Sequence, residues 1–149
     1  QGNYALARQH AEAALAISRE VEDPVAVSIG AGNLANLKID AGLQEDAQDL
    51  IAEAARAARR LGSITWLAAA AAVLAFLRVA QGRIDEALAL MGLSWEHPAM
   101  SSDTRQDAEY WIMPRLEETL TPEEIQAGME KGRDLDLDEV IDAFLAEAN

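Results

Sequence analysis

The chain has 149 residues, of which 50% are hydrophobic and 26% charged, with no cysteine and a formal net charge of −14 at pH 7. A chain of this size can bury one core, and its apolar content excludes a disordered protein. Missing cysteine excludes disulfide scaffolds and cysteine-based zinc sites, while the negative charge argues against direct contact with nucleic acid.

No stretch of the sequence has the character of a membrane or secretory segment. The longest apolar run, residues 64–77, is shorter than the roughly 20 residues needed to cross a bilayer. The N-terminus lacks the basic and apolar regions of a signal peptide. We therefore expect a cytoplasmic protein without a membrane partner.

Residue composition predicts an all-α fold. Alanine is the most frequent residue and greatly outnumbers the residues that favour strands. Alanine is concentrated in residues 1–100, whereas most of the acidic excess lies in residues 101–149. We therefore divide one compact domain into helical repeats, residues 1–95, and a C-terminal helical cap, residues 96–149.

The first part of the chain repeats with a period of 40 residues. Glycine and alanine recur at the same offsets at Gly2 and Ala7, Gly42 and Ala47, and Gly82 and Ala87. Apolar or small residues follow at helical spacing, which indicates two antiparallel helices per unit, stacked side by side. The alignment begins with the second half of a unit, so we expect a further helix before Gln1.

Local signals predict where these helices start and stop. Asp23 precedes a proline at the first helical position of residues 24–41, and Ser63 takes the same capping role for residues 64–81. Each helix is expected to stop at a left-handed glycine, Gly42 or Gly82. The helix that follows the second of these glycines should end near Gly92 or Trp95.

The cap contains three further helical segments. Pro114 should break or kink a helix over residues 103–119, because proline removes a backbone hydrogen bond. Thr121 and Glu124 have the spacing of a capping box that opens the next helix. The same spacing precedes the last helix, at Asp136 and Glu139.

Two stretches resemble the tetratricopeptide-repeat (TPR) pattern of paired helices packed through small and apolar residues: Asn33-Leu34-Ala35-Asn36 with Gly42, Ala47, Ile51 and Ala54, and Leu74-Ala75 with Gly82, Ala87 and Met91. The 40-residue unit looks like the longer variety in large bacterial signal-transducing ATPases. Residues 132–141 are similar to the tail of many LuxR-type transcriptional regulators. The resemblance implies a TPR-like α-α superhelix of antiparallel helix pairs, forming the C-terminal part of such a regulator.

Searches for metal sites fail on spacing. Residues 134–138 resemble the start of a calcium loop, but Glu139 and Leu145 stand where glycine and a bidentate glutamate are needed. His10 and His97 have no further ligands at a useful spacing. We expect no bound metal.

Signatures of catalysis and of nucleotide binding fail as well. There is no phosphate-binding glycine loop and no nucleophile in an activating motif. The carboxylate pairs fit a solvated acidic face, and a cluster of three arginines at residues 56–60 fits the C-terminal end of a helix dipole. The three tryptophans are interpreted as packing residues rather than as an aromatic cage. We expect no catalytic residue, no cofactor and no enzymatic activity.

The TPR resemblance implies a concave groove lined by the first helix of each pair. The candidate partner-binding residues are Asn33, Asn36, Asp40, Phe76 and Arg78. Asn36 and Phe76 occupy equivalent positions in consecutive units, where an amide could bind an extended backbone and a ring could anchor a side chain. A purely structural reading stays open, with the asparagines satisfying helix turns and Phe76 buried.

These observations favour a non-enzymatic interaction or sensory module of a larger bacterial signalling or transcription regulator, with a protein or peptide partner. A free-standing adaptor or self-assembling scaffold, including a homodimer through exposed repeat ends, is the alternative. A sensor domain that binds a small molecule is the third hypothesis.

Overall fold

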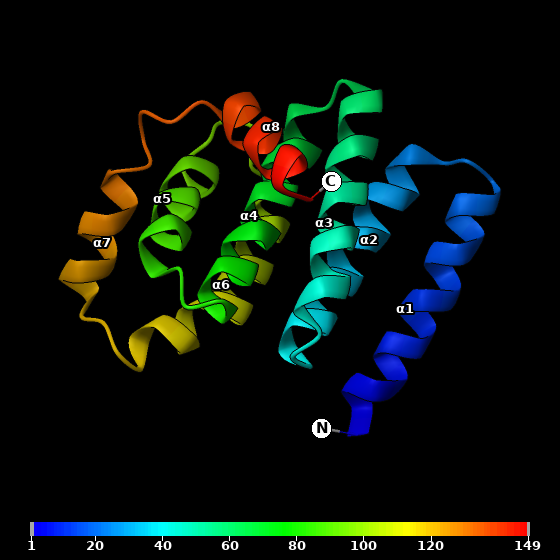
Figure 1. Cartoon of the computed structure of the whole chain (residues 1–149), viewed down its shortest axis with the longest axis horizontal. Helices are drawn as coiled ribbons and strands as arrows, with labels where there is room; N and C mark the ends of the chain where they lie inside the picture. The colour runs from blue at the N-terminus through cyan, green and yellow to red at the C-terminus, as the bar shows by residue number, and fades with distance from the viewer. Residues whose placement is uncertain (1, 149) are drawn as a thin grey trace.

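The computed structural model describes residues 2–148, which form eight α-helices and no strand (Figure 1). The helices are α1 (Gly2–Glu20), α2 (Pro24–Asp40), α3 (Gln44–Leu61), α4 (Ile64–Ala80), α5 (Ile84–Trp95), α6 (Ser102–Glu117), α7 (Pro122–Glu130) and α8 (Leu137–Ala148). The predicted all-α class is confirmed. No helix in this part of the chain has the length and apolar character to cross a membrane. The helix expected before Gln1 lies outside the described residues.

Helices α2 and α4 begin where the sequence predicts. The Asp23 carboxylate accepts hydrogen bonds from the backbone N–H groups of Val25 and Ala26, at 3.0 and 3.2 Å. The Ser63 hydroxyl accepts from the Trp66 N–H at 3.2 Å. Both side chains satisfy amides that the first helical turn leaves without partners, so the cap residues fix the starts.

The predicted stops are also confirmed. Gly42 and Gly82 have positive φ angles of 80° and 76°, a conformation in which a side chain would be strained. Helix α5 continues through Gly92 to Trp95, the later of the two predicted ends.

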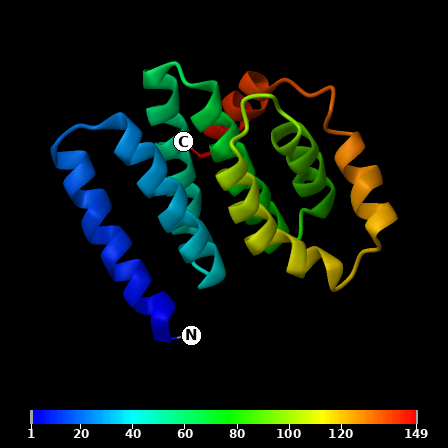
Figure 2. The ribbon, with the colours of Figure 1, turned by 180° about the vertical axis from the view of Figure 1, so that it is seen from behind.

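The helices pack mainly against their neighbours in the chain, and they place α2, α4 and α6 side by side. α4 contacts both α2 and α6, and α5 contacts α7. Seen from behind, α2 and α6 lie on the same side of the molecule, in front of α3 and α4 (Figure 2). Helix α4 therefore forms the bottom of the space between α2 and α6.

Small residues set the distances between helices. The alanines along the inner faces of α3 and α4 are almost fully buried, which lets the two helices approach closely. Three glycines, Gly92, Gly128 and Gly132, mark close approaches between α5 and the segment formed by α7 and the turn after it. A β-carbon on Gly92 would lie 1.8 Å from the Met129 carbonyl oxygen, and one on Gly132 would lie 1.8 Å from that of Ala89.

Pro114 does not end α6, so of the two predicted outcomes, a break or a kink, the break does not occur. The helix continues to Glu117, and its ribbon bends towards that end (Figure 2). Ile112 and Leu116, on either side of the proline, are 0% and 1% exposed. Their packing compensates for the backbone hydrogen bond that proline removes.

Helix α8 returns to the middle of the molecule and packs on α3 and α4 (Figure 1). Arg59 of α3 donates hydrogen bonds to the Asp142 carboxylate and to the Asp138 carbonyl oxygen of α8. Arg59 therefore holds a specific partner, beyond the helix-dipole interaction that the sequence suggests. The predicted capping box that opens α7 is present, with Thr121 and Glu124 each accepting from the other's backbone N–H.

Candidate functional site

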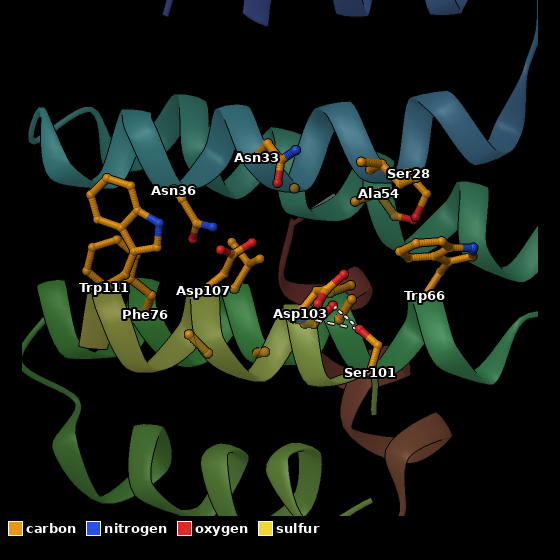
Figure 3. Close-up of a pocket in the computed structure, with 18 of the residues that line it drawn as sticks. Ser28, Asn33, Asn36, Ala54, Trp66, Phe76, Ser101, Asp103, Asp107 and Trp111 are labelled. Atoms are coloured by element: carbon orange, nitrogen blue, oxygen red, sulfur yellow. Dashed lines mark hydrogen bonds between the residues drawn. The ribbon is translucent and has the colours of Figure 1, made fainter. Parts of the chain in front are cut away.

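A cavity of about 330 Å³ lies between α2, α4 and α6. We call it the α2–α4–α6 cavity. Its size falls at the lower end of the range of ligand-binding pockets, roughly 300–1,000 Å³. Figure 3 shows that aromatic rings stand at both ends and polar side chains in the middle.

The α2 wall contributes a buried amide that has no partner. Asn36 is 8% exposed, and its side chain makes no hydrogen bond to any described residue. It points into the α2–α4–α6 cavity, towards Asp107 of α6 (Figure 3). Asn33, one turn earlier, is exposed at the same wall, whereas the Ser28 hydroxyl donates to the Ala54 carbonyl oxygen at 3.1 Å. Because the Asn36 amide faces the cavity and makes no protein hydrogen bond, it is available to bind an occupant.

The α6 wall contributes two carboxylates. Asp103 and Asp107 are four residues apart, which places both on one face of the helix, and both line the cavity. Neither makes a hydrogen bond or an ion pair with any described residue, and both are exposed. The Arg105 guanidinium between them in sequence donates instead to the Trp95 carbonyl oxygen. No lysine, arginine or histidine of the described chain lines the cavity.

One end of the cavity is closed by stacked rings. Phe76 is 1% exposed and stacks on Trp111, with ring centroids 5.7 Å apart and planes at 26°. Tyr4 and Tyr110 pack on the same tryptophan, with centroids at 5.8 and 5.1 Å. Their hydroxyls share a 2.6 Å hydrogen bond, which, together with desolvation, raises the pKa of Tyr4 above its ordinary value. Trp66 stands alone at the opposite end (Figure 3).

An ion pair joins α6 to α2 beside the stacked end of the cavity. Arg115 of α6 donates to the Asp40 carboxylate of α2 at 2.9 Å. Its guanidinium also lies over the Phe76 ring, 4.8 Å from the centroid. Asp40 therefore lies beside the cavity, as the sequence suggests, but its carboxylate is already occupied, and so is one face of Phe76.

Arg78 does not line the α2–α4–α6 cavity. It is 3% exposed and donates to Gln81 at 2.8 Å and to Glu147 of α8 at 3.1 Å. Two residues along a helix correspond to a rotation of about 200°, so Arg78 lies almost opposite Phe76 on α4. Of the five predicted residues, Asn33, Asn36 and Phe76 line the cavity.

Other candidates from the sequence gain no ligands in the structure. No group of three potential metal-ligating side chains occurs among the described residues. Trp66 and Trp111 line the cavity and Trp95 does not, so the three tryptophans form no common cage. The sequence reasoning missed Asp103 and Asp107, because residues 96–149 were interpreted only as a cap. The signal in the sequence was the spacing of four residues between Asp103, Asp107 and Trp111, which places all three on one face of a helix.

The α2–α4–α6 cavity thus combines a buried amide, two free carboxylates and aromatic rings within a rigid helical frame. Such a set can bind a ligand through hydrogen bonds, charge and ring contacts. A comparison of this chain with protein-family models, with curated proteins and with solved structures finds no match.

Proposed function

We propose that the chain is a non-enzymatic, TPR-like helical-repeat module that binds an extended peptide segment of a protein partner in the α2–α4–α6 cavity. The observation that carries the proposal is the amide of Asn36, which is 8% exposed and without a partner. An amide side chain offers both a donor and an acceptor, as does each residue of an extended backbone. A bound peptide would therefore satisfy Asn36 and itself be held in register.

The length of the cavity suits a short extended segment. Asp103 and Trp111 of α6 are eight residues apart, which corresponds to about 12 Å along a helix. At about 3.3–3.6 Å per extended residue, that distance accommodates three or four residues. Trp66 and Trp111 stand towards opposite ends and would hold apolar parts of the segment.

Binding rather than turnover is supported by the chemistry of the wall. The hydroxyl of Ser101 is engaged in capping α6 and in a 2.9 Å hydrogen bond with Thr104. Asp103 and Asp107 are exposed, and no histidine of the described chain lines the cavity to pair with them. General acid and base catalysis needs groups whose pKa values are driven apart by a desolvated site.

The wider role is a proposal from the resemblance of the repeats and of residues 132–141 to the C-terminal parts of bacterial signalling and transcription regulators. In such a cytoplasmic protein, binding of the partner would shift the population of an attached effector domain between two states. The effect can be no larger than the difference in affinity of the partner for those states.

The experiment is selection of a displayed library of unconstrained heptapeptides on the purified chain, followed by calorimetric titration of the enriched peptides. Asn36→Ala should weaken their binding by about tenfold or more, which corresponds to about 1.4 kcal/mol. Gln106→Ala is the matched control, since Gln106 is exposed on α6 and does not line the cavity. Failure to enrich any peptide that depends on Asn36 would overturn the proposal.

A self-assembling scaffold is the second candidate, and one observation favours it. Leu6, Ile17 and Val21, in and just after α1, are 53%, 61% and 67% exposed, while Leu15 is the buried hydrophobic residue of that helix. An apolar face of this kind can pair with a second copy of the chain. Light scattering after size exclusion should then show a dimer that Ile17→Glu dissociates and Ile64→Glu, also at an exposed isoleucine, does not. A wild-type monomer would exclude this candidate.

A further inference from the structure

We infer that the peptide segment carries a lysine or arginine side chain, whose cationic group enters the α2–α4–α6 cavity between Asp103, Asp107 and the Trp66 ring. The inference rests on the proposed function and specifies the chemistry of its ligand. It follows from the charge, the buried amide and the aromatic surface of the cavity.

The two carboxylates lack a counter-charge. Asp103 and Asp107 lie one turn apart on α6, where neighbouring Cβ atoms are about 5–6 Å apart and like charges destabilise a helix. No cation of the described chain lines the cavity to offset them. A cationic group placed between the two carboxylates would remove this repulsion and form charge-assisted hydrogen bonds.

Asn36 supplies an independent indication that a polar group belongs in the cavity. The amide is 8% exposed, faces Asp107 across the cavity, and makes no hydrogen bond to a described residue (Figure 3). Its carbonyl oxygen can accept from a peptide N–H and its NH₂ group can donate to a peptide carbonyl. A peptide held in this way runs beside both carboxylates of α6.

The aromatic rings select the end at which the cation would bind. One face of Phe76 is already covered by the Arg115 guanidinium, 4.8 Å from the ring centroid. Trp66 stands at the other end, on the Asp103 side of Asp107 (Figure 3). It is partly exposed and carries no such cation among the described residues. A cation over a tryptophan face is attracted by the negative face of the ring. The Asp103 end therefore combines a free charge and a free ring.

A basic peptide also agrees with the long-range field of the chain. The formal net charge is −14, so positively charged segments are attracted before contact is made. The methylene stem of lysine or arginine can lie along the apolar side chains of Ile29 and Val73, which line the same cavity.

The test titrates capped tetrapeptides that differ at one central position, occupied by lysine, arginine, glutamine or glutamate, with leucine and alanine elsewhere. The lysine and arginine peptides should bind about tenfold or more tightly than the glutamine peptide, and the glutamate peptide should bind most weakly. Added salt should reduce the preference, because the carboxylates are exposed. Butylammonium, which carries the charge without a backbone, should bind more weakly than the lysine peptide.

The double variant Asp103→Asn, Asp107→Asn keeps the side-chain shape and should abolish the preference for the basic peptides. Glu45→Gln with Asp49→Asn is the matched control: these acids are exposed, four residues apart on α3, and outside the cavity. Both variants change the net charge equally, so long-range attraction is the same in each. The control should keep the preference.

The outcomes separate this inference from the proposed function. Peptide binding that depends on Asn36 but not on the charge of the central residue would overturn the inference of a cationic side chain. The proposal of a peptide-binding site would remain. If butylammonium binds as tightly as the lysine peptide, the proposal of a peptide ligand is overturned, and the ligand is a small organic amine. No binding of any tetrapeptide would overturn both proposals.

Discussion

Gly92 of α5 lies so close to Met129 of α7 that the two backbones are in direct contact. A β-carbon at Gly92 would stand 1.8 Å from the Met129 carbonyl oxygen and 2.6 Å from its carbonyl carbon. Backbone atoms cannot move aside as a flexible side chain can. The spacing of α5 and α7 is therefore set by the absence of a side chain at this position.

Gly92→Ala should destabilise the protein by about 1–3 kcal/mol, because the added carbon forces α5 and α7 apart. Urea unfolding followed by circular dichroism measures the change. Gly30→Ala is the control, since its β-carbon would meet Leu15 at 3.5 Å, an ordinary contact. That variant should be neutral or gain about 0.5–1 kcal/mol, because alanine is the better helix former. Equal stability of the two variants would contradict the close approach.

Substitutions at Arg78 and Arg83 compare how much a buried and an exposed arginine of one ion-pair network contribute to the free energy of unfolding. Both contact the carboxylates of Glu86 and Glu147, but the Arg78 side chain is 4% exposed and that of Arg83 is 39% exposed. Arg78→Ala should cost about 1.5–3 kcal/mol through lost charged hydrogen bonds and lost packing on Phe144.

Arg83→Ala should cost less than about 1 kcal/mol, because solvent screens an exposed pair. Thermal unfolding of the two variants at the same pH and salt concentration gives the comparison. If Arg83→Ala is the more damaging change, α8 is not anchored through the buried arginine.

The capping box of α7 should make a measurable contribution to stability. Thr121 accepts from the Glu124 N–H at 3.2 Å and Glu124 accepts from the Thr121 N–H at 2.8 Å. Thr121→Ala removes one of these bonds and should cost about 1 kcal/mol. Thr119→Ala, at an exposed threonine two residues earlier, should change the free energy of unfolding little. Denaturant titration distinguishes the two.

The ion pair between Glu96 and Arg133 should stabilise the fold in a pH-dependent way. Arg133 donates two hydrogen bonds to the Glu96 carboxylate, at 2.8 and 3.1 Å, and they lower the pKa of Glu96 below its ordinary value. A pKa lower in the folded than in the unfolded state means that the stabilisation is fully present above the unfolded pKa, about 4.3 for glutamate. It is lost as the pH falls through the folded pKa.

Arg133→Gln should return the pKa of Glu96 towards its ordinary value, which carboxyl NMR titration can follow directly. Lys131→Gln is the control, because it removes the same charge from an exposed neighbour that makes no hydrogen bond or ion pair with Glu96. An unchanged Glu96 titration in Arg133→Gln would show that the ion pair does not form in solution.

Local signals in the sequence predicted the helix boundaries well. The caps at Asp23, Ser63 and Thr121 and the glycines at 42 and 82 act through neighbouring backbone atoms, so a short stretch of sequence contains their physics. The choice between a break and a kink at Pro114 could not be made from the sequence, because it depends on the tertiary packing of Ile112 and Leu116.

The candidate site was predictable only in part, for the same reason. Asn36 and Phe76 follow from the repeat, since equivalent positions face the same space. Asp103 and Asp107 become wall residues only because α6 packs on α4, which no local pattern encodes. The contact of Arg78 with Glu147 could not be predicted from the sequence, because the two residues are 69 positions apart in the chain.

Because α8 packs back onto α3 and α4, the N-terminal and C-terminal helices should differ in how easily they unfold locally. α1 packs mainly on α2 and buries Leu15 as its hydrophobic core residue, so its opening exposes little of the core. It breaks only exposed contacts with later helices, those of Tyr4 with α6 and of Arg19 with Glu53 of α3. The C-terminal segment, in contrast, is tied to helices formed much earlier in the chain. Amide protons should therefore exchange with solvent first along α1, and those of α3, α4 and α8 should exchange together in one cooperative opening.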